Sequence, residues 1–148
     1  MRLIIQRVNT AQVSVEGKVV GKINHGLFIL VGIRQKDTEK DVEILSEKIA
    51  KLRIMSDKTG KMNLSICEVG KEILVVSQFT LYADTSGGNR PSFIKAGEPK
   101  MAEKLYQMFT RKLKDKRLKV ETGSFGKYMQ IDCELDGPVT ISLASEEI

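Results

Sequence analysis

Hydrophobic and polar residues alternate through the first third of the chain, and this alternation predicts β-strands. Apolar side chains recur at every second position in residues 3–8, 11–15, 19–23 and 27–33. A period of two places successive side chains on opposite faces of a sheet, so each segment can bury one face. The Glu-Gly pair at 16–17 is typical of a tight turn. We expect consecutive antiparallel strands here.

The spacing of apolar residues lengthens to that of a helix in two later segments. Residues 38–53 and 99–115 have apolar side chains every three or four positions, which predicts two amphipathic helices. Thr38, next to Asp37, can cap the first helix, and Pro99 suits the first turn of the second.

The remaining apolar segments predict three more strands. Residues 72–81 are so rich in aliphatic and β-branched side chains that both faces are expected to be buried. Residues 128–135 and 139–143 are separated by Asp-Gly-Pro at 136–138. The whole chain, residues 1–148, is expected to form one α+β domain, in which mainly antiparallel, barrel-like sheets are covered by two main helices.

Composition narrows the chemistry that the chain can perform. Its 148 residues include one histidine, His25, and two cysteines, Cys67 and Cys133. These are too few for a His-rich or thiolate metal site or for a disulfide scaffold, and they fit a reducing compartment. A Ser-His-Asp triad would have to use His25, which precedes Gly26 at an expected turn, where a structural role competes with a catalytic one.

No segment indicates a membrane or secretory protein. The longest uncharged apolar stretch, residues 26–33, is far shorter than the roughly 20 residues that span a bilayer. Arg2 is followed at once by a strand pattern, without a small-residue cleavage site. We therefore expect a cytoplasmic protein.

The chain is basic, with a net charge of +5, and its cations cluster in one place. Residues 111–119 hold six cations and one anion. One interpretation is a solvated helix end, since Lys and Arg favour the last turn of a helix. The other is a contact with the phosphate backbone of a nucleic acid.

Polar side chains stand at the end of the otherwise apolar strand 72–81. Burying Ser77, Gln78 and Thr80 without partners would cost about 1–3 kcal/mol each, so either neighbouring strands satisfy them or the strand opens onto a site. Strict alternation sends Ser77 and Thr80 to opposite faces. If both serve one site, the strand must bend or end near Phe79.

Three glycine-containing segments are further candidates. Residues 87–93 form a flexible loop around Arg90, which suits either an RNA backbone or a plain surface connection. Residues 122–126 combine small residues with Phe125, allowing either close approach to a base or a tight connection whose ring joins the core. Gly137-Pro138 fits an ordinary hairpin with a trans bond, or a cis bond presenting two carbonyls as acceptors for an ammonium group.

Taken together, these segments resemble the D-aminoacyl-tRNA deacylase family, also called D-tyrosyl-tRNA deacylase. The resemblance runs over residues 1–143. It is carried by Ser-Gln-Phe-Thr-Leu at 77–81, Gly-Asn-Arg-Pro-Ser-Phe at 88–93, Gly-Ser-Phe-Gly at 123–126 and Asp-Gly-Pro-Val-Thr at 136–140, with shorter matches at 7–8, 52–54 and 60–65.

The resemblance implies a cytosolic homodimer, without metal or other cofactor, that hydrolyses the ester between a D-amino acid and the terminal adenosine of tRNA. It implies neither a membrane nor a DNA partner. The site residues that it implies fall into four groups. On this resemblance, the scissile ester is held by Ser77, Gln78, Phe79 and Thr80. The α-carbon is inspected by Gly137 and Pro138, which are joined by a cis bond and act in the partner's pocket. The adenine is bound by Phe125, Gly126 and Met129 and the RNA by Arg90, while Arg7 supports the Gly-Pro element.

The chain departs from the family pattern at two places. Leu135 stands where the family usually has Asn, and Lys127-Tyr128 stand where it usually has Ala-Asp. Backbone groups of Gly137 and Pro138 can still discriminate between D- and L-amino acids, so Leu135 affects the positioning of these groups more than the chemistry. The second change concerns the detail of the adenine pocket.

An aminoacyl ester is activated, so orientation and an oxyanion hole can suffice for its hydrolysis. We expect main-chain N–H groups near Phe79 and Thr80 to hold the oxyanion, while Ser77 and Gln78 fix the ester. Thr80 is a candidate nucleophile, but no base is evident beside it, which favours water activated by the 2′-hydroxyl of the tRNA. Glycyl-tRNA, lacking a side chain, should also be hydrolysed.

Two other classes of protein stay open on the residues alone. The basic run 111–119 and the Arg90 loop also fit a non-catalytic RNA-binding module. A purely structural dimerisation domain is the third, although it leaves the polar residues at 77–80 without a purpose.

Overall fold

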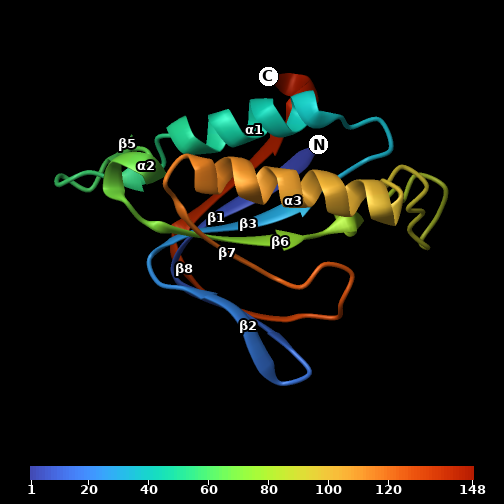
Figure 1. Cartoon of the computed structure of the whole chain (residues 1–148), viewed down its shortest axis with the longest axis horizontal. Coiled ribbons are helices and arrows are strands. Elements are labelled where there is room, and N and C mark those ends of the chain that lie inside the picture. The colour runs from blue at the N-terminus through green and yellow to red at the C-terminus, as the bar shows by residue number, and fades with distance from the viewer.

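A computed structural model describes residues 1–148, in which one mixed sheet carries a layer of helices (Figure 1). The strands of this sheet run in the order β2-β1-β3-β6-β7, and β8 pairs with the other edge of β1. Their bounds are β1 (Arg2–Val15), β2 (Lys18–Ile23), β3 (Gly26–Gly32), β6 (Glu72–Ser77), β7 (Lys119–Thr122) and β8 (Gln130–Ala144).

Two helices, α1 (Glu39–Lys51) and α3 (Pro99–Asp115), lie side by side on one face of the sheet (Figure 1). Thr38 begins α1 in a capping box, in which its amide donates to Asp41 Oδ2 over 2.8 Å. Pro99 opens α3 as expected. The apolar stripes of both helices face the sheet and build the larger core cluster, with Phe109 and Leu45 fully buried.

A second, smaller cluster lies on the other face, where β2 folds back over the sheet. Its members are Val8, Ala11, Val13, Ile23, Phe28, Leu74 and Val76. Gly21 of β2 comes so close to β7 that a Cβ on it would lie 2.4 Å from the Thr122 carbonyl oxygen. This approach nearly closes the sheet into a barrel, which confirms the predicted fold class.

Short elements fill the connections. They are β4 (Met55–Ser56), β5 (Met62–Leu64), α2 (Ile66–Val69), and the 3-10 turns η1 (Phe79–Tyr82) and η2 (Ser145–Glu147). None of the helices is long and apolar enough to cross a bilayer.

The strand predicted at 72–81 was too long. It ends at Ser77, because the chain turns into η1, where the Leu81 amide donates to the Gln78 carbonyl over 3.3 Å. The apolar residues after Ser77 belong to that turn.

The two strands predicted at 128–135 and 139–143 are one strand. Both halves of β8 pair with the long strand β1, with Val8 opposite Leu135 and Gln6 opposite Thr140. Residues 136–139 therefore form a bulge opposite the single residue Arg7, rather than a hairpin turn.

Most strand pairs of the sheet are antiparallel, as predicted, because β1 pairs antiparallel with β2, β3 and β8. The pairs β3–β6 and β6–β7 are parallel, with α1 and α3 as their crossover connections. Strand β7 was missed because it has only four residues, two of them charged.

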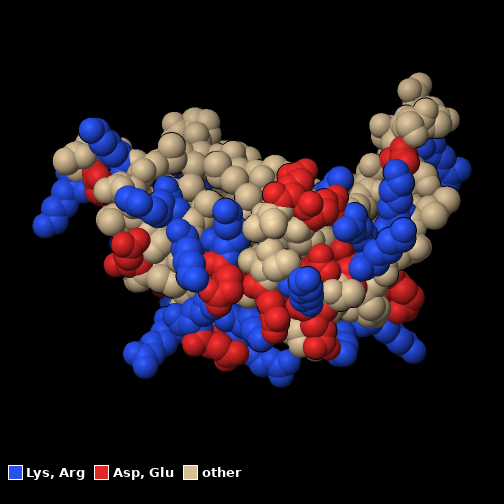
Figure 2. Space-filling view, turned by 90° about the horizontal axis from the view of Figure 1, so that it is seen from above, with Lys and Arg blue, Asp and Glu red and all other residues tan.

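Three of the six cations in the basic run at 111–119 form ion pairs with acidic residues. Lys112 Nζ lies 3.1 Å from Glu43 Oε1, Lys119 Nζ lies 2.7 Å from Glu72 Oε1, and Lys116 pairs with Glu47. Figure 2 shows blue and red side chains intermingled on the side of the molecule that it presents. This arrangement favours the interpretation of a solvated helix end.

Candidate active site

A cleft of about 650 Å³ opens beyond the carboxyl end of β6, between η1, the start of α3 and the segment that joins β7 to β8. It brings together two groups of residues that lie about fifty positions apart in the sequence. The first group is Ser77, Gln78 and Phe79, and the second is Phe125, Gly126 and Met129. Its lining is mainly apolar, with a few polar groups, as in a site that binds a small organic group.

Backbone geometry at the end of β6 turns the polar residues toward this cleft. The Gln78 amide donates to the Val31 carbonyl over 2.8 Å, and the chain then enters η1. The amides of Phe79 and Thr80 open that turn, where N–H groups have no acceptor within the helix. Thr80 is exposed and is not among the residues that line the cleft, and its hydroxyl accepts a hydrogen bond from the Gln78 side-chain amide. The strand therefore ends before Phe79, as it must if Ser77 and Thr80 are to serve one site.

One wall of the cleft consists of two aromatic rings. The centroids of Phe79 and Phe93 are 5.0 Å apart, with the rings inclined at 70°, an edge-to-face arrangement. Phe93 is held there because Asp84 and Ser92 exchange two backbone hydrogen bonds of 2.8 Å, which close the loop. The Lys95 ammonium, 2.7 Å from the Asp84 carboxylate, holds the pKa of that group well below its usual range. Arg90 lies in this exposed loop, outside the cleft.

The opposite wall is supported by the core. The Phe125 ring lies 5.7 Å from the ring of Tyr106, whose hydroxyl donates to the Val75 carbonyl over 2.7 Å. Burial raises the pKa of Tyr106, so its hydroxyl stays protonated and remains a donor. Met129 Sδ accepts from the Ser124 amide over 3.4 Å, and a Cβ on Gly123 would lie 2.7 Å from the same sulfur. The glycine therefore lets the methionine close this wall.

Arg7 is buried beneath the bulge of β8. Its Nε lies 2.8 Å from Asp136 Oδ2, although the Nε–H does not point along a hydrogen bond, so the contact is ionic. Its Nη1 donates to the Ile54 carbonyl over 3.0 Å and to Ser56 Oγ over 3.2 Å. The peptide bond between Gly137 and Pro138 is cis, and both residues are exposed.

His25 also approaches this bulge, which the sequence did not indicate. Its Nε2 lies 3.5 Å from Asp136 Oδ2, on the side chain that Arg7 contacts. His25 and Asp136 are more than a hundred positions apart, and neither belongs to a pattern that would pair them. The residue is remote from the cleft lining, so no histidine serves the cleft.

The Gly137-Pro138 pair does not reach the cleft of its own chain. Arg7, opposite the bulge, is in register with Leu27, and Leu27 is in register with Ile73, four residues before Ser77. The bulge is therefore separated from Ser77 by three strand spacings of about 4.8 Å across the sheet and by four residues of about 3.3 Å each along β6.

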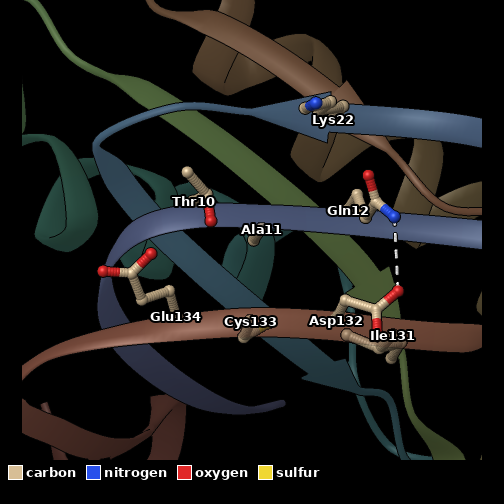
Figure 3. A pocket seen from close by; sticks show the side chains of 8 residues that line it. All are labelled: Thr10, Ala11, Gln12, Lys22, Ile131, Asp132, Cys133 and Glu134. Carbon is tan, nitrogen blue, oxygen red and sulfur yellow. Dashed lines mark hydrogen bonds between the residues drawn. The ribbon is translucent and has the colours of Figure 1, made fainter.

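A separate shallow hollow lies between β1, β2 and β8 (Figure 3). Gln12 Nε2 donates to Asp132 Oδ2 across it over 3.3 Å. Burial raises the pKa of Cys133 in its floor, which keeps the sulfur as an unreactive thiol. No group of three or more His, Cys, Asp or Glu side chains is arranged to hold a metal ion.

The sequence matches the family of D-Tyr-tRNA(Tyr) deacylases over residues 4–144. The chain belongs to this family. It is similar to the D-aminoacyl-tRNA deacylase of Brevibacillus brevis, at 52% identity over 98% of this chain and all of that protein. The D-aminoacyl-tRNA deacylase of Aquifex aeolicus is 53% identical over the full length of both. The resemblance found in the motifs is thereby confirmed, and this family member is a hydrolase acting on D-aminoacyl-tRNA.

Solved structures agree with this assignment. A protein described as c-Myc DNA Unwinding Element Binding Protein superposes with a TM-score of 0.91, at 39% identity over 97% of this chain and 98% of its own. A probable eukaryotic D-amino acid tRNA deacylase shares the fold of this deacylase with a TM-score of 0.85, at 16% identity over 96% and 97% of the two chains.

Proposed function

We propose that the cleft holds the terminal adenosine of D-aminoacyl-tRNA and presents its ester to the end of β6. The observation that carries this proposal is the meeting of residues 77–79 with Phe125, Gly126 and Met129 around one cleft. A flat base suits the space between an aromatic ring and a thioether, because both are polarizable and apolar. Gly126, at φ +71°, provides the turn that aligns this wall.

The ester is hydrolysed by groups that do not titrate. In our proposal the amides of Phe79 and Thr80 stabilise the oxyanion, and Ser77 and Gln78 orient the carbonyl. Water adds to the carbonyl carbon, the bond to the adenosine 3′-oxygen breaks, and that oxygen takes the proton. D-amino acid and tRNA are released.

The 2′-hydroxyl of the tRNA is our preferred group for activating water. Thr80 has the Gln78 amide as its hydrogen-bond partner, and an amide is not a base. The only histidine lies beside Asp136, away from the cleft. A threonine nucleophile would therefore lack the activation that it needs.

Chirality is read, in our proposal, by Gly137 and Pro138 of the partner subunit in a homodimer. Two observations support an arrangement between two copies: the pair is exposed, and it lies across the sheet from the cleft of its own chain. The free edge of β8 also carries exposed Ile131 and Leu135, which a second copy would cover. The carbonyls of the pair accept from the ammonium group, and Pro138 blocks the direction of an L side chain.

The remaining assignments follow from the same proposal. Arg7 holds the bulge through Asp136, and Arg90 contacts RNA from the exposed loop. No metal or other cofactor is required by the steps above, and neither membrane nor DNA takes part. The reaction belongs in the cytoplasm, where aminoacyl-tRNA is made and used.

Deacylation of matched D- and L-tyrosyl-tRNA by the purified protein tests the proposal. Release of D-tyrosine at a rate at least a hundredfold above that of L-tyrosine is expected. A non-catalytic RNA-binding module would bind both tRNAs with salt-dependent affinity and release neither amino acid. Measuring the free amino acid separates the two functions, whereas measuring affinity does not.

A further inference from the structure

In the segment that joins β7 to β8, the ring of Tyr128 points away from the core. A turn in which the Lys127 amide donates to the Ser124 carbonyl over 3.3 Å directs Phe125 and Met129 inward. Tyr128, between them, is 90% exposed, more than any other large hydrophobic residue of the chain. Core packing therefore does not account for this side chain.

Tyr128 stands on a ridge between two hollows. With Lys127 it lines the adenosine cleft, and the same two residues line a second hollow of about 270 Å³. The far side of the second hollow is the turn between β1 and β2, and Gln130 completes it. Its other lining residues are Ser14, Val15, Glu16 and Gly17.

We propose that the second hollow binds the nucleotide that precedes the terminal adenosine of the tRNA, with its base stacked on Tyr128. This inference rests on the proposed function, which places the adenosine in the cleft. The two hollows share the ridge of Lys127 and Tyr128, so one strand of RNA can occupy both. Exposed aromatic rings bind successive bases of single-stranded nucleic acids in this way.

The charged groups of the second hollow fit a nucleotide. Neither Lys127 nor Glu16 makes an ion pair with another residue. Lys127 is placed on the ridge, where the phosphate between the two nucleotides would cross. Glu16 repels a phosphate but accepts a hydrogen bond from an exocyclic amino group, which the penultimate cytosine of tRNA supplies.

A fluorescence titration tests the stacking directly. The chain has no tryptophan, so Tyr128→Trp introduces a single reporter on the ridge. The dinucleotide CpA is expected to quench this tryptophan and to bind about tenfold more tightly than adenosine. Ile94→Trp is the matched control, since Ile94 is 80% exposed and lines neither hollow. Equal quenching by adenosine and CpA, or an equal response from the control, overturns the inference.

Kinetics then separates this inference from the proposed function. D-tyrosyl-tRNA with an abasic residue at the penultimate position should have a KM about tenfold higher than normal D-tyrosyl-tRNA. Tyr128→Ala should remove that difference by raising the KM of the normal substrate. If the unaltered protein cleaves neither substrate, the proposed function fails. If it cleaves both with equal KM, only the stacking inference fails.

A contact between two copies of the chain is the competing explanation for the exposed ring. Sedimentation of Tyr128→Ala addresses it. The inference requires the same association state as the unaltered protein at the same concentration, and dissociation caused by the substitution overturns it.

Discussion

Arg7 of β1 contacts Asp136 at the start of the β8 bulge, with 2.8 Å between Nε and Oδ2. The guanidinium is buried and also donates to the Ile54 carbonyl and Ser56 Oγ. One side chain thus ties the bulge carrying Gly137 to the connection after α1. This relationship makes Arg7 a positioning residue in the proposed mechanism.

Arg7→Ala is expected to lower the free energy of unfolding by about 2–4 kcal/mol, because it leaves a carboxylate and a buried carbonyl without their partner. Urea denaturation measures this loss. Arg2→Ala, on the same strand but with a side chain 47% exposed, should cost less than about 1 kcal/mol. Arg7→Lys should fold better than Arg7→Ala yet show weaker preference for D- over L-tyrosyl-tRNA, since a lysine lacks the guanidinium fork. Equal chiral preference in Arg7→Lys and the unaltered protein would argue against the positioning role.

Thr80→Ala should retain turnover within about threefold, because the proposed attack uses water activated by the RNA. D-tyrosyl-tRNA ending in 2′-deoxyadenosine should be inert, a loss of at least about 100-fold. Single-turnover deacylation measures both. The opposite pattern, with an inactive variant and a reactive 2′-deoxy substrate, would establish Thr80 as the nucleophile.

Glycyl-tRNA is expected to be hydrolysed at a rate near that of D-tyrosyl-tRNA. Its α-carbon has no side chain for Pro138 to exclude, so the steric test that rejects L-residues passes it. Release of radiolabelled glycine measures the rate. Rejection of glycyl-tRNA at enzyme levels that clear D-tyrosyl-tRNA is incompatible with steric exclusion.

Gly123→Ala should raise the KM for D-aminoacyl-tRNA about tenfold while the protein stays folded. The new Cβ would lie 2.7 Å from Met129 Sδ, so the flexible methionine must move and reshape the adenosine wall. Gly87→Ala is the control, because a Cβ there meets nothing within 4 Å. Steady-state kinetics and thermal melting of the two variants provide the comparison. Unaltered KM in Gly123→Ala would remove Met129 from the adenosine site.

Acid should destabilise the protein partly through Asp41. Burial alone would raise the pKa of this carboxyl, but hydrogen bonds from Ser145 and Thr38 outweigh it and lower the pKa from 3.8 to about 2. A lowered folded-state pKa means that ionised Asp41 stabilises the fold above about pH 4, and that this contribution disappears as the pH falls from about 4 to 2. The shift converts to an upper limit of about 2.4 kcal/mol, and the actual contribution is smaller because solvent screens this partly exposed carboxylate.

Asp41→Asn should therefore be less stable than the unaltered protein at pH 6, with a smaller difference at pH 2.5, as measured by urea midpoints. Asp115→Asn removes an exposed carboxylate and serves as the control. A stability difference for Asp41→Asn that is the same at both pH values would contradict the assignment.

Local patterns in the sequence were sufficient to predict α1, α3, β2 and β3. Residues 3–8 and 11–15, predicted as two strands, are instead the single strand β1 (Arg2–Val15), because β8 pairs with it along nearly its whole length. Helix α3 spans Pro99–Asp115 as predicted, because the period of its apolar residues and its opening proline are properties of neighbouring residues. The motifs around Ser77, Phe125 and Gly137 also sufficed to identify the family, since they are contiguous in the chain.

Only the tertiary structure decided how these segments meet. Hydrogen bonds to β1 join residues 130–144 into one strand with a bulge, although Asp-Gly-Pro locally favours a turn. The end of β6 at Ser77, its approach to Phe125, and the contacts of Asp136 with Arg7 and His25 depend on residues far apart in sequence. Such contacts arise from sheet register and packing between elements, which the spacing of residues within any one segment does not encode.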